Sequence, residues 1–203
     1  MNKKLATYLP LTKKELTEFF EAYRQAFPDW EVEHDVVLTR KHGPLRQAIY
    51  LEGLRYAAYR PGHSIDLLIN VPDGCSLLQQ HLDVKHRQVE RREHAAKWPV
   101  VLNAMEEQFL PAIRKPLDVA ETLRLAEEEM ERDRINNINH FTGLAVLNAY
   151  LGNTERALYW CGRVEETATH LGRPLGDWET RKRRYSLELQ QAIMAGNVLA
   201  FLA

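Results

Sequence analysis

The sequence predicts an α+β fold: an N-terminal helix, an antiparallel β-meander of three to four strands, and about six helices that end in a helical hairpin and a C-terminal helix. Two observations predict it. Apolar residues over 12–28 repeat with the helical period of about 3.6, whereas those over 31–71 alternate with the strand period of two. Helical spacing then returns and continues to the end of the chain. Strands and helices segregated in this way indicate α+β rather than a parallel α/β sheet.

The first helix has a defined start and end. Thr12 and Glu15 fit a capping box, in which each side chain accepts a hydrogen bond from a backbone N–H that the first turn leaves free. Pro28 is expected to stop the helix. Its apolar face follows at helical spacing and consists of Leu16, Phe19, Phe20, Tyr23 and Phe27.

Three strands are predicted over about 31–40, 45–54 and 64–71, with a short strand over 56–60 between the last two. Short connections of this kind favour an antiparallel meander. The turns that separate the strands are expected at His42-Gly43-Pro44, Pro61-Gly62 and Pro72-Asp73-Gly74.

No strand is predicted after Gly74. Leu78, Leu82 and Val89 outline a helix that ends by Trp98, because Pro99 disfavours helix in the residue before it. A further helix is outlined by Val101, Met105, Phe109 and Ile113 and closed by Pro116.

The remaining chain is predicted to be helical. Asp118 and Glu121 make a second capping box, and helices are expected over 137–151, 154–171 and 177–195. We expect an α+β domain over 1–115 and a helical extension over 116–203 packed on it, the two forming one structural unit.

The pair of helices around 149–164 loosely resembles a tetratricopeptide hairpin. Tyr150, Gly152 and Ala157 carry the resemblance, since a glycine ends the first helix and a small residue lets the second pack closely. The tryptophan typical of the first helix is absent, and no second copy follows at an offset of about 34 residues. We interpret the segment as a plain antiparallel helix pair.

Composition excludes several classes of protein. Lys plus Arg is 27 and Asp plus Glu is 28, so no global field attracts nucleic acid or an acidic membrane. No signal peptide or apolar run of membrane-spanning length is visible, which predicts a cytoplasmic protein. Only Cys75 and Cys161 occur, so neither a disulfide framework nor a zinc set is expected.

No catalytic, metal or cofactor site is predicted. His81, His86 and His94 are five and eight residues apart, so they would not share one helix face as metal ligands do. Cys75 has no identifiable base and is interpreted as a buried or capping-region cysteine. The segment around Ser64 matches neither a phosphate loop nor a dinucleotide-binding turn.

A basic run stands near the C-terminus. Arg181, Lys182, Arg183 and Arg184 are consecutive and would cover all sides of one helical turn. Such a cluster could meet phosphate, and nucleic-acid binding is kept as one alternative function, although the near-neutral chain makes it the less favoured one. The acidic run over 127–134 could equally lie against these arginines.

The segment over 36–71 resembles small bacterial α+β domains of unknown function, some of which are thought to act as toxin-immunity proteins. The resemblance rests on Thr39-Arg40 at a strand end, Gly43 in a turn, and the segments Arg46–Gly53 and Ser64–Val71. It covers under half of the chain, and it implies no catalytic residue.

The favoured function is a non-enzymatic protein-binding module, with immunity or toxin neutralisation as its most concrete form. Tyr and Arg are residue types that anchor protein interfaces, although tyrosines in a strand often only pack the sheet. The candidate partner-binding residues are Arg40, Tyr50, Arg55, Tyr56, Tyr59 and Arg60 in the meander, and Trp178, Arg181, Arg183, Arg184 and Tyr185 in the C-terminal part.

Two further possibilities stay open. A small-molecule enzyme would need a site between sheet and helices, around Arg40, Glu52, His63 and Asp66. A homodimer through the C-terminal helices is conceivable because 197–203 is largely apolar, although this segment could instead dock on the protein's own core.

Overall fold

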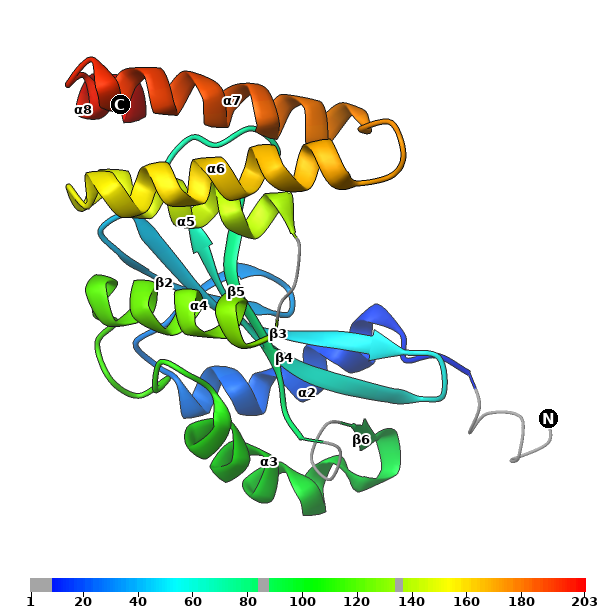
Figure 1. Ribbon diagram of the computed structural model, residues 1–203. Helices are drawn as coiled ribbons and strands as arrows, with labels where there is room; N and C mark the ends of the chain where they lie inside the picture. Colours follow the sequence, from blue (N-terminus) through cyan, green and yellow to red (C-terminus); the bar gives the residue numbers. More distant parts are fainter. Residues whose placement is uncertain (1–8, 84–87, 134–136) are drawn as a thin grey trace. The chain divides into compact units, whose positions relative to one another are not determined.

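The computed structural model describes residues 9–83, 88–133 and 137–203, and it confirms the α+β class (Figure 1). The described residues form seven α-helices and six strands. They divide into two compact units. The first unit comprises 9–41, Gln47–Ser64 and Gln79–Leu117, and the second unit comprises His42–Arg46, Ile65–Leu78 and Asp118–Ala203. The predicted boundary at 115 and the packing of its two parts into one structural unit stay predictions.

The first helix, α2 (Lys13–Ala26), begins and ends as the sequence predicts. Glu15 N donates to Thr12 Oγ1 over 3.2 Å, and Thr12 N donates to Glu15 Oε2 over 2.9 Å, which completes the capping box. The helix buries Phe20 and Tyr23 in the core of the first unit.

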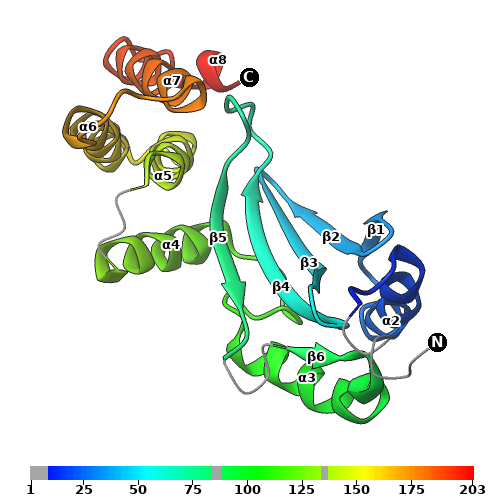
Figure 2. The ribbon, with the colours of Figure 1, turned by 90° about the vertical axis from the view of Figure 1, so that its right-hand side faces the viewer.

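The strands form one sheet in the order β1-β2-β3-β4-β5, with a short β6 that pairs with β4 (Figure 2). The antiparallel meander is confirmed, with more strands than predicted. The strands are β1 (Glu31–His34), β2 (Val37–His42), β3 (Leu45–Leu54), β4 (Ala58–Leu67), β5 (Ser76–His81) and β6 (Val89–Glu90).

The prediction of one strand over 31–40 was wrong, because β1 and β2 fold back on each other. Glu31 pairs with Thr39 and Val32 with Leu38, with an irregularity before His34. Asp35 lies in the turn between them. The alternation of apolar and polar residues continues across Asp35, so periodicity alone could not reveal the turn.

The turn predicted at Pro61-Gly62 is also wrong, since β4 runs through both residues. The pairing of β4 with β6 involves Ala58 and Tyr59, so Pro61 lies beyond the paired residues, where its missing N–H interrupts no hydrogen bond to β6. Gly62 lies under the ring of Tyr50, where an added Cβ would stand 2.4 Å from Tyr50 Cζ. This glycine therefore serves a close contact between strands and not a turn.

The helix outlined by Leu78, Leu82 and Val89 was wrong, and the helix outlined by Val101, Met105, Phe109 and Ile113 was right only in its first half, since the helix there begins at His94 and ends at Gln108. Their region contains β5, β6, a 3₁₀ turn η1 (Arg91–Glu93) and one helix, α3 (His94–Gln108). Leu78 and Leu82 are four residues apart, a spacing that places two side chains on one face of a helix and equally on one face of a strand. Pro99 lies inside α3 on its exposed side, where the helix forgoes one hydrogen bond and continues.

The helices predicted over 137–151, 154–171 and 177–195 are confirmed to within one residue at each end, whereas the last short helix of the second unit was not predicted. The helices of this unit are α4 (Val119–Asp133), α5 (Ile138–Tyr150), α6 (Thr154–His170), α7 (Asp177–Met194) and α8 (Val198–Leu202). Glu121 N donates to Asp118 Oδ1 over 2.8 Å at the start of α4. Gly152 has φ +79 after α5, a conformation that favours glycine at a helix end.

Helix α5 is apolar on nearly all sides and forms the centre of the second unit, where α4, α6, α7 and α8 contact it. A single carboxylate ties three of these helices together. Glu127 Oε1 on α4 accepts from Asn148 Nδ2 on α5 over 2.9 Å, and from Arg156 Nε (2.9 Å) and Trp160 Nε1 (2.5 Å) on α6. Glu127 and Glu131 of the acidic run both pair with Arg156. Their partner is therefore on α6 and not in the basic run of α7.

Two helical glycines have opposite surroundings. A Cβ on Gly143 of α5 would lie 2.4 Å from Cys75 Sγ and 3.0 Å from Leu77 Cδ2, so the glycine is needed for this contact. A Cβ on Gly162 of α6 would meet no atom within 4 Å.

The apolar C-terminal segment docks in part on its own unit. The rings of Tyr185 and Phe201 lie 5.1 Å apart, and α8 contacts α5 and α7. Leu199 remains 70% exposed. A homodimer through this surface stays a prediction.

Candidate functional site

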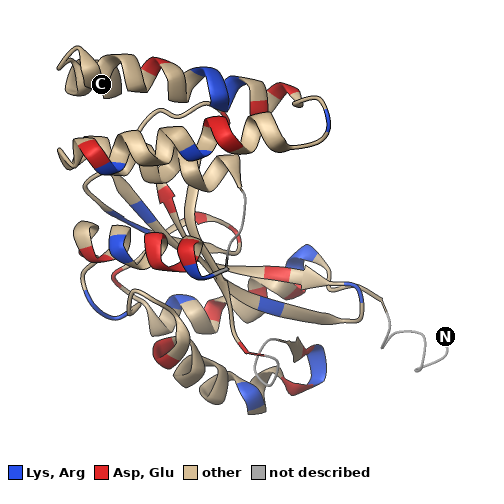
Figure 3. Cartoon of the chain, in the orientation of Figure 1, with Lys and Arg blue, Asp and Glu red and all other residues tan. Residues whose placement is uncertain are grey.

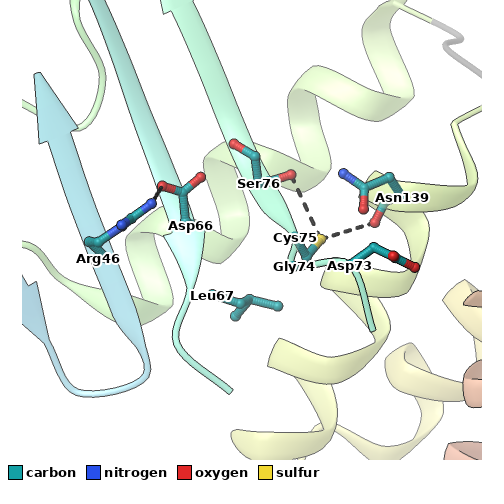
Figure 4. A pocket seen from close by; sticks show the side chains of 8 residues that line it. All are labelled: Arg46, Asp66, Leu67, Asp73, Gly74, Cys75, Ser76 and Asn139. Atoms are coloured by element: carbon teal, nitrogen blue, oxygen red, sulfur yellow. Dashed lines mark hydrogen bonds and ion pairs between the residues drawn. The ribbon is translucent and has the colours of Figure 1, made fainter. Parts of the chain in front are cut away.

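A cavity of about 380 Å³ lies in the second unit (Figure 4). Its walls come from the start of β3, the end of β4, the loop before β5, and the first turn of α5. Such a volume falls in the lower part of the ~300–1,000 Å³ range of small-molecule sites. The polar and sulfur-bearing side chains that line it are Arg46, Asp66, Asp73, Cys75, Ser76 and Asn139.

The strand side of the cavity carries an ion pair. Arg46 Nη2 on β3 donates to Asp66 Oδ2 on β4 over 2.9 Å, and both side chains are partly buried. In Figure 4 these two side chains lie on the strands, and Asn139 faces them from the helix side.

The loop before β5 is held in an uncommon backbone conformation. Gly74 N donates to Val71 O over 2.9 Å, and Asp73 and Gly74 have φ +60 and +65. Glycine adopts this region freely, and Asp tolerates it better than most residues.

Helix α7 clamps this loop from outside the cavity. Arg181 donates to both carboxylate oxygens of Asp73, over 2.9 and 2.7 Å, and Lys182 Nζ donates to Gly74 O. The hydrogen bond from Arg181 lowers the pKa of Asp73, while burial lowers the pKa of the fully buried Lys182. The basic run therefore contributes two residues that fix a cavity wall.

Cys75 is a packing residue. Its Sγ donates to Asn139 O over 3.0 Å, and burial raises the pKa of the thiol to about 11. A thiol with such a pKa is protonated at neutral pH and is a poor nucleophile. Both cysteines are free and buried.

The other cations of the basic run are also paired. Arg183 Nε donates to Glu165 Oε2 over 2.8 Å, and Arg184 Nε donates to Glu188 Oε1 over 2.8 Å. Figure 3 shows acidic and basic segments interspersed along α6 and α7. An anionic ligand would have to compete with these pairs, which weakens the alternative of nucleic-acid binding. Trp178 is exposed, whereas Tyr185 is partly buried against Phe201.

Tyr59, one of the predicted partner-binding residues, is fully buried in the first unit. Its hydroxyl lies 3.4 Å from Tyr23 Oη and 2.8 Å from His94 Nδ1, and burial raises its pKa to about 12. Placing it on a binding surface was therefore a wrong interpretation. Successive side chains of β4 point to opposite faces of the sheet, and the sequence alone did not show which face the helices cover.

Three of the other meander candidates, Arg40, Tyr50 and Arg60, are held by neighbours within the first unit. Tyr50 Oη accepts from Gln79 Nε2 over 3.1 Å. Arg60 Nε donates to Glu52 Oε2 over 2.9 Å. Arg60, a partner-binding candidate, is thus paired with Glu52, one of the four residues of the enzyme hypothesis. Arg40 lies over the ring of Trp30, with 4.6 Å from Cζ to the ring centroid.

Arg40 also begins a buried chain of hydrogen bonds that the sequence did not reveal. Arg40 Nε donates to Gln47 Oε1 (2.7 Å), Gln47 Nε2 to His63 Nε2 (2.9 Å), and His63 Nδ1 to Gln80 Oε1 (3.3 Å). These directions require a neutral His63, since a second ring N–H would face the Gln47 amide. Burial lowers the pKa of His63 to about 4, and the charge of Arg40 acts in the same direction.

The four residues of the enzyme hypothesis are thus only partly connected. Arg40 and His63 are linked through Gln47, while Glu52 pairs with Arg60. Asp66 belongs to the second unit and lines its cavity. Gln47 and Gln80 complete the chain, and no sequence signal distinguishes them from other glutamines.

The tip of the β3–β4 hairpin presents two of the predicted residues to solvent. Arg55 is exposed, and Tyr56 is 65% exposed. The next residue, Ala57, has φ +53 although it is not a glycine, and its side chain is buried. Its carbonyl oxygen accepts a hydrogen bond from Arg91 N over 2.8 Å.

Within the described part of the chain, no group of three or more His, Cys, Asp or Glu side chains could hold a metal ion. His86 lies outside the described residues. His81 is in β5, and His94 is bound to Tyr59 at the start of α3.

No described helix combines the length and apolar composition that a membrane crossing requires. The predicted cytoplasmic location is not tested by this finding. No protein-family model, curated protein or solved structure matches the chain.

Proposed function

We propose that this protein is a non-enzymatic binding module whose partner is another protein, and that the tip of the β3–β4 hairpin contacts that partner. The observation that supports it is Tyr56, a large aromatic side chain 65% exposed beside a residue at φ +53. Tyr and Arg are the residue types most often found at the energetic centre of protein interfaces.

The backbone of the tip is fixed at a cost in stability. A non-glycine residue in the left-handed region loses roughly 1–2 kcal/mol relative to the right-handed one. Ala57 is held there by the burial of its side chain and by the hydrogen bond from Arg91 N. Strain of this kind is often found at functional positions.

A fixed tip also reduces the entropy that binding must overcome, because the turn is already ordered before the partner arrives. Arg55 forms no ion pair with any residue in the described part of the chain, whereas the nearby Arg60 and Arg91 pair with Glu52 and Glu15. The tip therefore fits a partner with an apolar pocket bordered by a carboxylate. The resemblance of the strand segment to immunity proteins makes a toxin the first partner class to test.

The test compares Tyr56→Ala with Tyr150→Ala, a matched change at a tyrosine on α5 that is 41% exposed. Tagged wild-type protein is expressed in its host, and the proteins that co-purify in stoichiometric amount are identified and titrated back. We expect Tyr56→Ala to weaken binding at least tenfold, the range of a central interface tyrosine, and Tyr150→Ala to leave it unchanged.

Either of two results would overturn the proposal. One is a wild-type protein that retains no stoichiometric protein partner. The other is a partner that binds Tyr56→Ala as tightly as wild type, while circular dichroism shows that the variant is folded.

A further inference from the structure

We infer that Asp73 is a site of spontaneous conversion to isoaspartate and that its ion pair with Arg181 suppresses this conversion. The inference rests on the sequence Asp73-Gly74, on the exposure of these two residues, and on the contacts that hold them. It is independent of the hairpin tip, because all of these residues belong to the second unit.

The reaction needs only the protein and water. The amide nitrogen of the residue after an aspartic acid attacks the side-chain Cγ, and the carboxyl hydroxyl leaves as water together with the amide hydrogen. The product is a five-membered succinimide ring, which a water molecule then opens. Opening at the original main-chain carbonyl gives isoaspartate, whose main chain runs through Cβ and Cγ, and opening at the other carbonyl restores aspartate. The mass of the protein is unchanged, and neither an oxidant nor a reductant takes part.

The pair Asp73-Gly74 has the sequence that favours this reaction. Asp73 is the only Asp or Asn in the chain that a glycine follows. A glycine has no Cβ, so its nitrogen can be approached closely. Both residues are exposed, and a Cβ built on Gly74 would meet no atom within 4 Å beyond its chain neighbours. Water therefore reaches the pair.

Arg181 opposes the reaction at the carboxyl group. Its guanidinium donates to both oxygens of Asp73, over 2.9 and 2.7 Å, which is a bidentate contact. In Figure 4 the side chain of Asp73 points away from Arg46 and Asp66. The hydrogen bond from Arg181 lowers the pKa of Asp73, so the protonated carboxyl is scarcer at neutral pH. The protonated carboxyl is the reactive form, because only it can release water.

The attacking nitrogen is held as well. Gly74 N donates to Val71 O over 2.9 Å, and Lys182 Nζ donates to Gly74 O. The nitrogen must give up its hydrogen bond before it can approach Cγ of Asp73. Ring closure needs both reacting atoms in one orientation, and a displacement of about 1 Å can slow a reaction roughly 100-fold. The contacts from α7 therefore hold a reactive sequence in an unreactive arrangement.

Isoaspartate at position 73 alters this arrangement. It adds one methylene to the main chain and removes one from the side chain, so the carboxylate moves from its place opposite Arg181. The class of enzyme that would act on the modified loop is a methyltransferase specific for isoaspartyl carboxylates.

The test measures isoaspartate in the full chain during incubation at neutral pH. Samples are digested, and electron-transfer fragmentation locates isoaspartate, because its longer main chain gives distinct fragments. Wild type unfolded in guanidinium chloride gives the rate without the contacts. We expect folded Arg181→Met to form isoaspartate at position 73 roughly tenfold faster than folded wild type, since the orientation of reacting groups can change a rate by this factor.

Two further variants separate these contacts from overall stability. Arg183→Met removes the neighbouring ion pair between α7 and Glu165, and it should react at the wild-type rate. Arg181→Lys keeps the positive charge but cannot make the bidentate contact, so it should react faster than wild type even if Arg181→Met fails to fold. Circular dichroism checks that each variant is folded.

The inference is wrong if folded Arg181→Met and Arg181→Lys form isoaspartate no faster than wild type. It is also wrong if Arg183→Met is accelerated equally, or if folded wild type reacts as fast as the unfolded chain. None of these results bears on the hairpin tip, whose test uses a protein partner and different residues.

Discussion

The two units place polar groups in their interiors in different ways. In the first unit the hydrogen-bonded chain has two fully buried neutral members, Gln47 and His63, and its ends, Arg40 and Gln80, are partly buried. The second unit buries charge itself. Lys182 is fully buried against Gly74 O, and Glu127 accepts three hydrogen bonds from two other helices.

The difference shows what each arrangement can do. Neutral groups lose less hydration free energy on burial, but a histidine among them makes the unit sensitive to acid. Buried charges lose more hydration free energy, and they recover it only with several well-placed partners. A buried charge therefore favours the one arrangement in which its partners are in place. In the second unit that arrangement joins helix α7 to the loop before β5.

The largest effect is expected at Lys182. Lys182→Ala should lower the free energy of unfolding by about 3 kcal/mol, because it leaves a void and an unpaired carbonyl at Gly74. Lys182→Met keeps the apolar stem and should cost about 1 kcal/mol, since burying the charge is itself unfavourable. Urea unfolding followed by tryptophan fluorescence measures both. An alanine variant as stable as wild type would show that Lys182 does not anchor the loop.

Acid should affect the first unit through His63. Its pKa of about 4 lies below the ordinary 6.5, so between these pH values the unfolded chain binds a proton that the folded chain does not. The free energy of unfolding therefore falls as pH is lowered from 6.5 to 4, by about 3 kcal/mol for this group alone. The full stabilisation is present above pH 6.5.

His63→Gln removes this titration. The difference in free energy of unfolding between wild type and variant is measured by urea unfolding at several pH values. It should change between pH 4 and pH 6.5 and be constant above pH 6.5. His94 and His140 also have pKa values lowered by burial, and both are present in the two proteins, so their contribution cancels. A difference independent of pH would contradict the neutral chain.

A neutral replacement tests whether the second unit needs its charges. Glu127→Gln should lower the free energy of unfolding by about 2 kcal/mol, because the three hydrogen bonds to Oε1 then have a neutral acceptor in place of a charged one. Thermal unfolding by circular dichroism is the measurement. If glutamine were tolerated at no cost, the distinction between the two units would not hold at this position.

The smallest effect has the opposite sign. Gly162→Ala should raise the free energy of unfolding by about 0.5–1 kcal/mol, because alanine favours helix and its Cβ meets open space. Gly143→Ala is the matched comparison and should destabilise, since its Cβ would overlap Cys75 Sγ. Calorimetry of the two variants would separate helix propensity from packing. An equal response at both glycines would contradict the packing described for α5.

Sequence reasoning succeeded where the signal was local. Thr12 and Glu15 cap α2 through contacts three residues apart, and Gly152 ends α5 by its own backbone preference. It failed where a pattern fits two structures. Leu78 and Leu82 fit a helix and a strand equally, and it is the pairing of β5 with β4 that places Leu78 in a strand, which ends just before Leu82.

The candidate sites depended more strongly on tertiary structure. The sequence shows that Arg181 belongs to a cationic run. Its ion-pair partner Asp73 lies 108 residues away, and nothing in the sequence around Asp73 predicts that the two residues pair. Tyr59 and Tyr56 have the same residue type and lie three positions apart, yet one is buried and the other is the most exposed tyrosine described. Burial of a single strand residue is set by the helices that cover it.

The clamp on the loop before β5 has a consequence during synthesis of the chain. The loop and its two anchors on α7 are separated by 108 residues, so the ribosome makes the loop long before it makes the anchors. At ~5–20 residues per second, the interval is roughly 5–20 s. During that time Asp73 and Gly74 have the local hydrogen bond to Val71 O but lack their contacts with Arg181 and Lys182. The wall of the cavity is therefore among the last parts of the second unit to reach its final form.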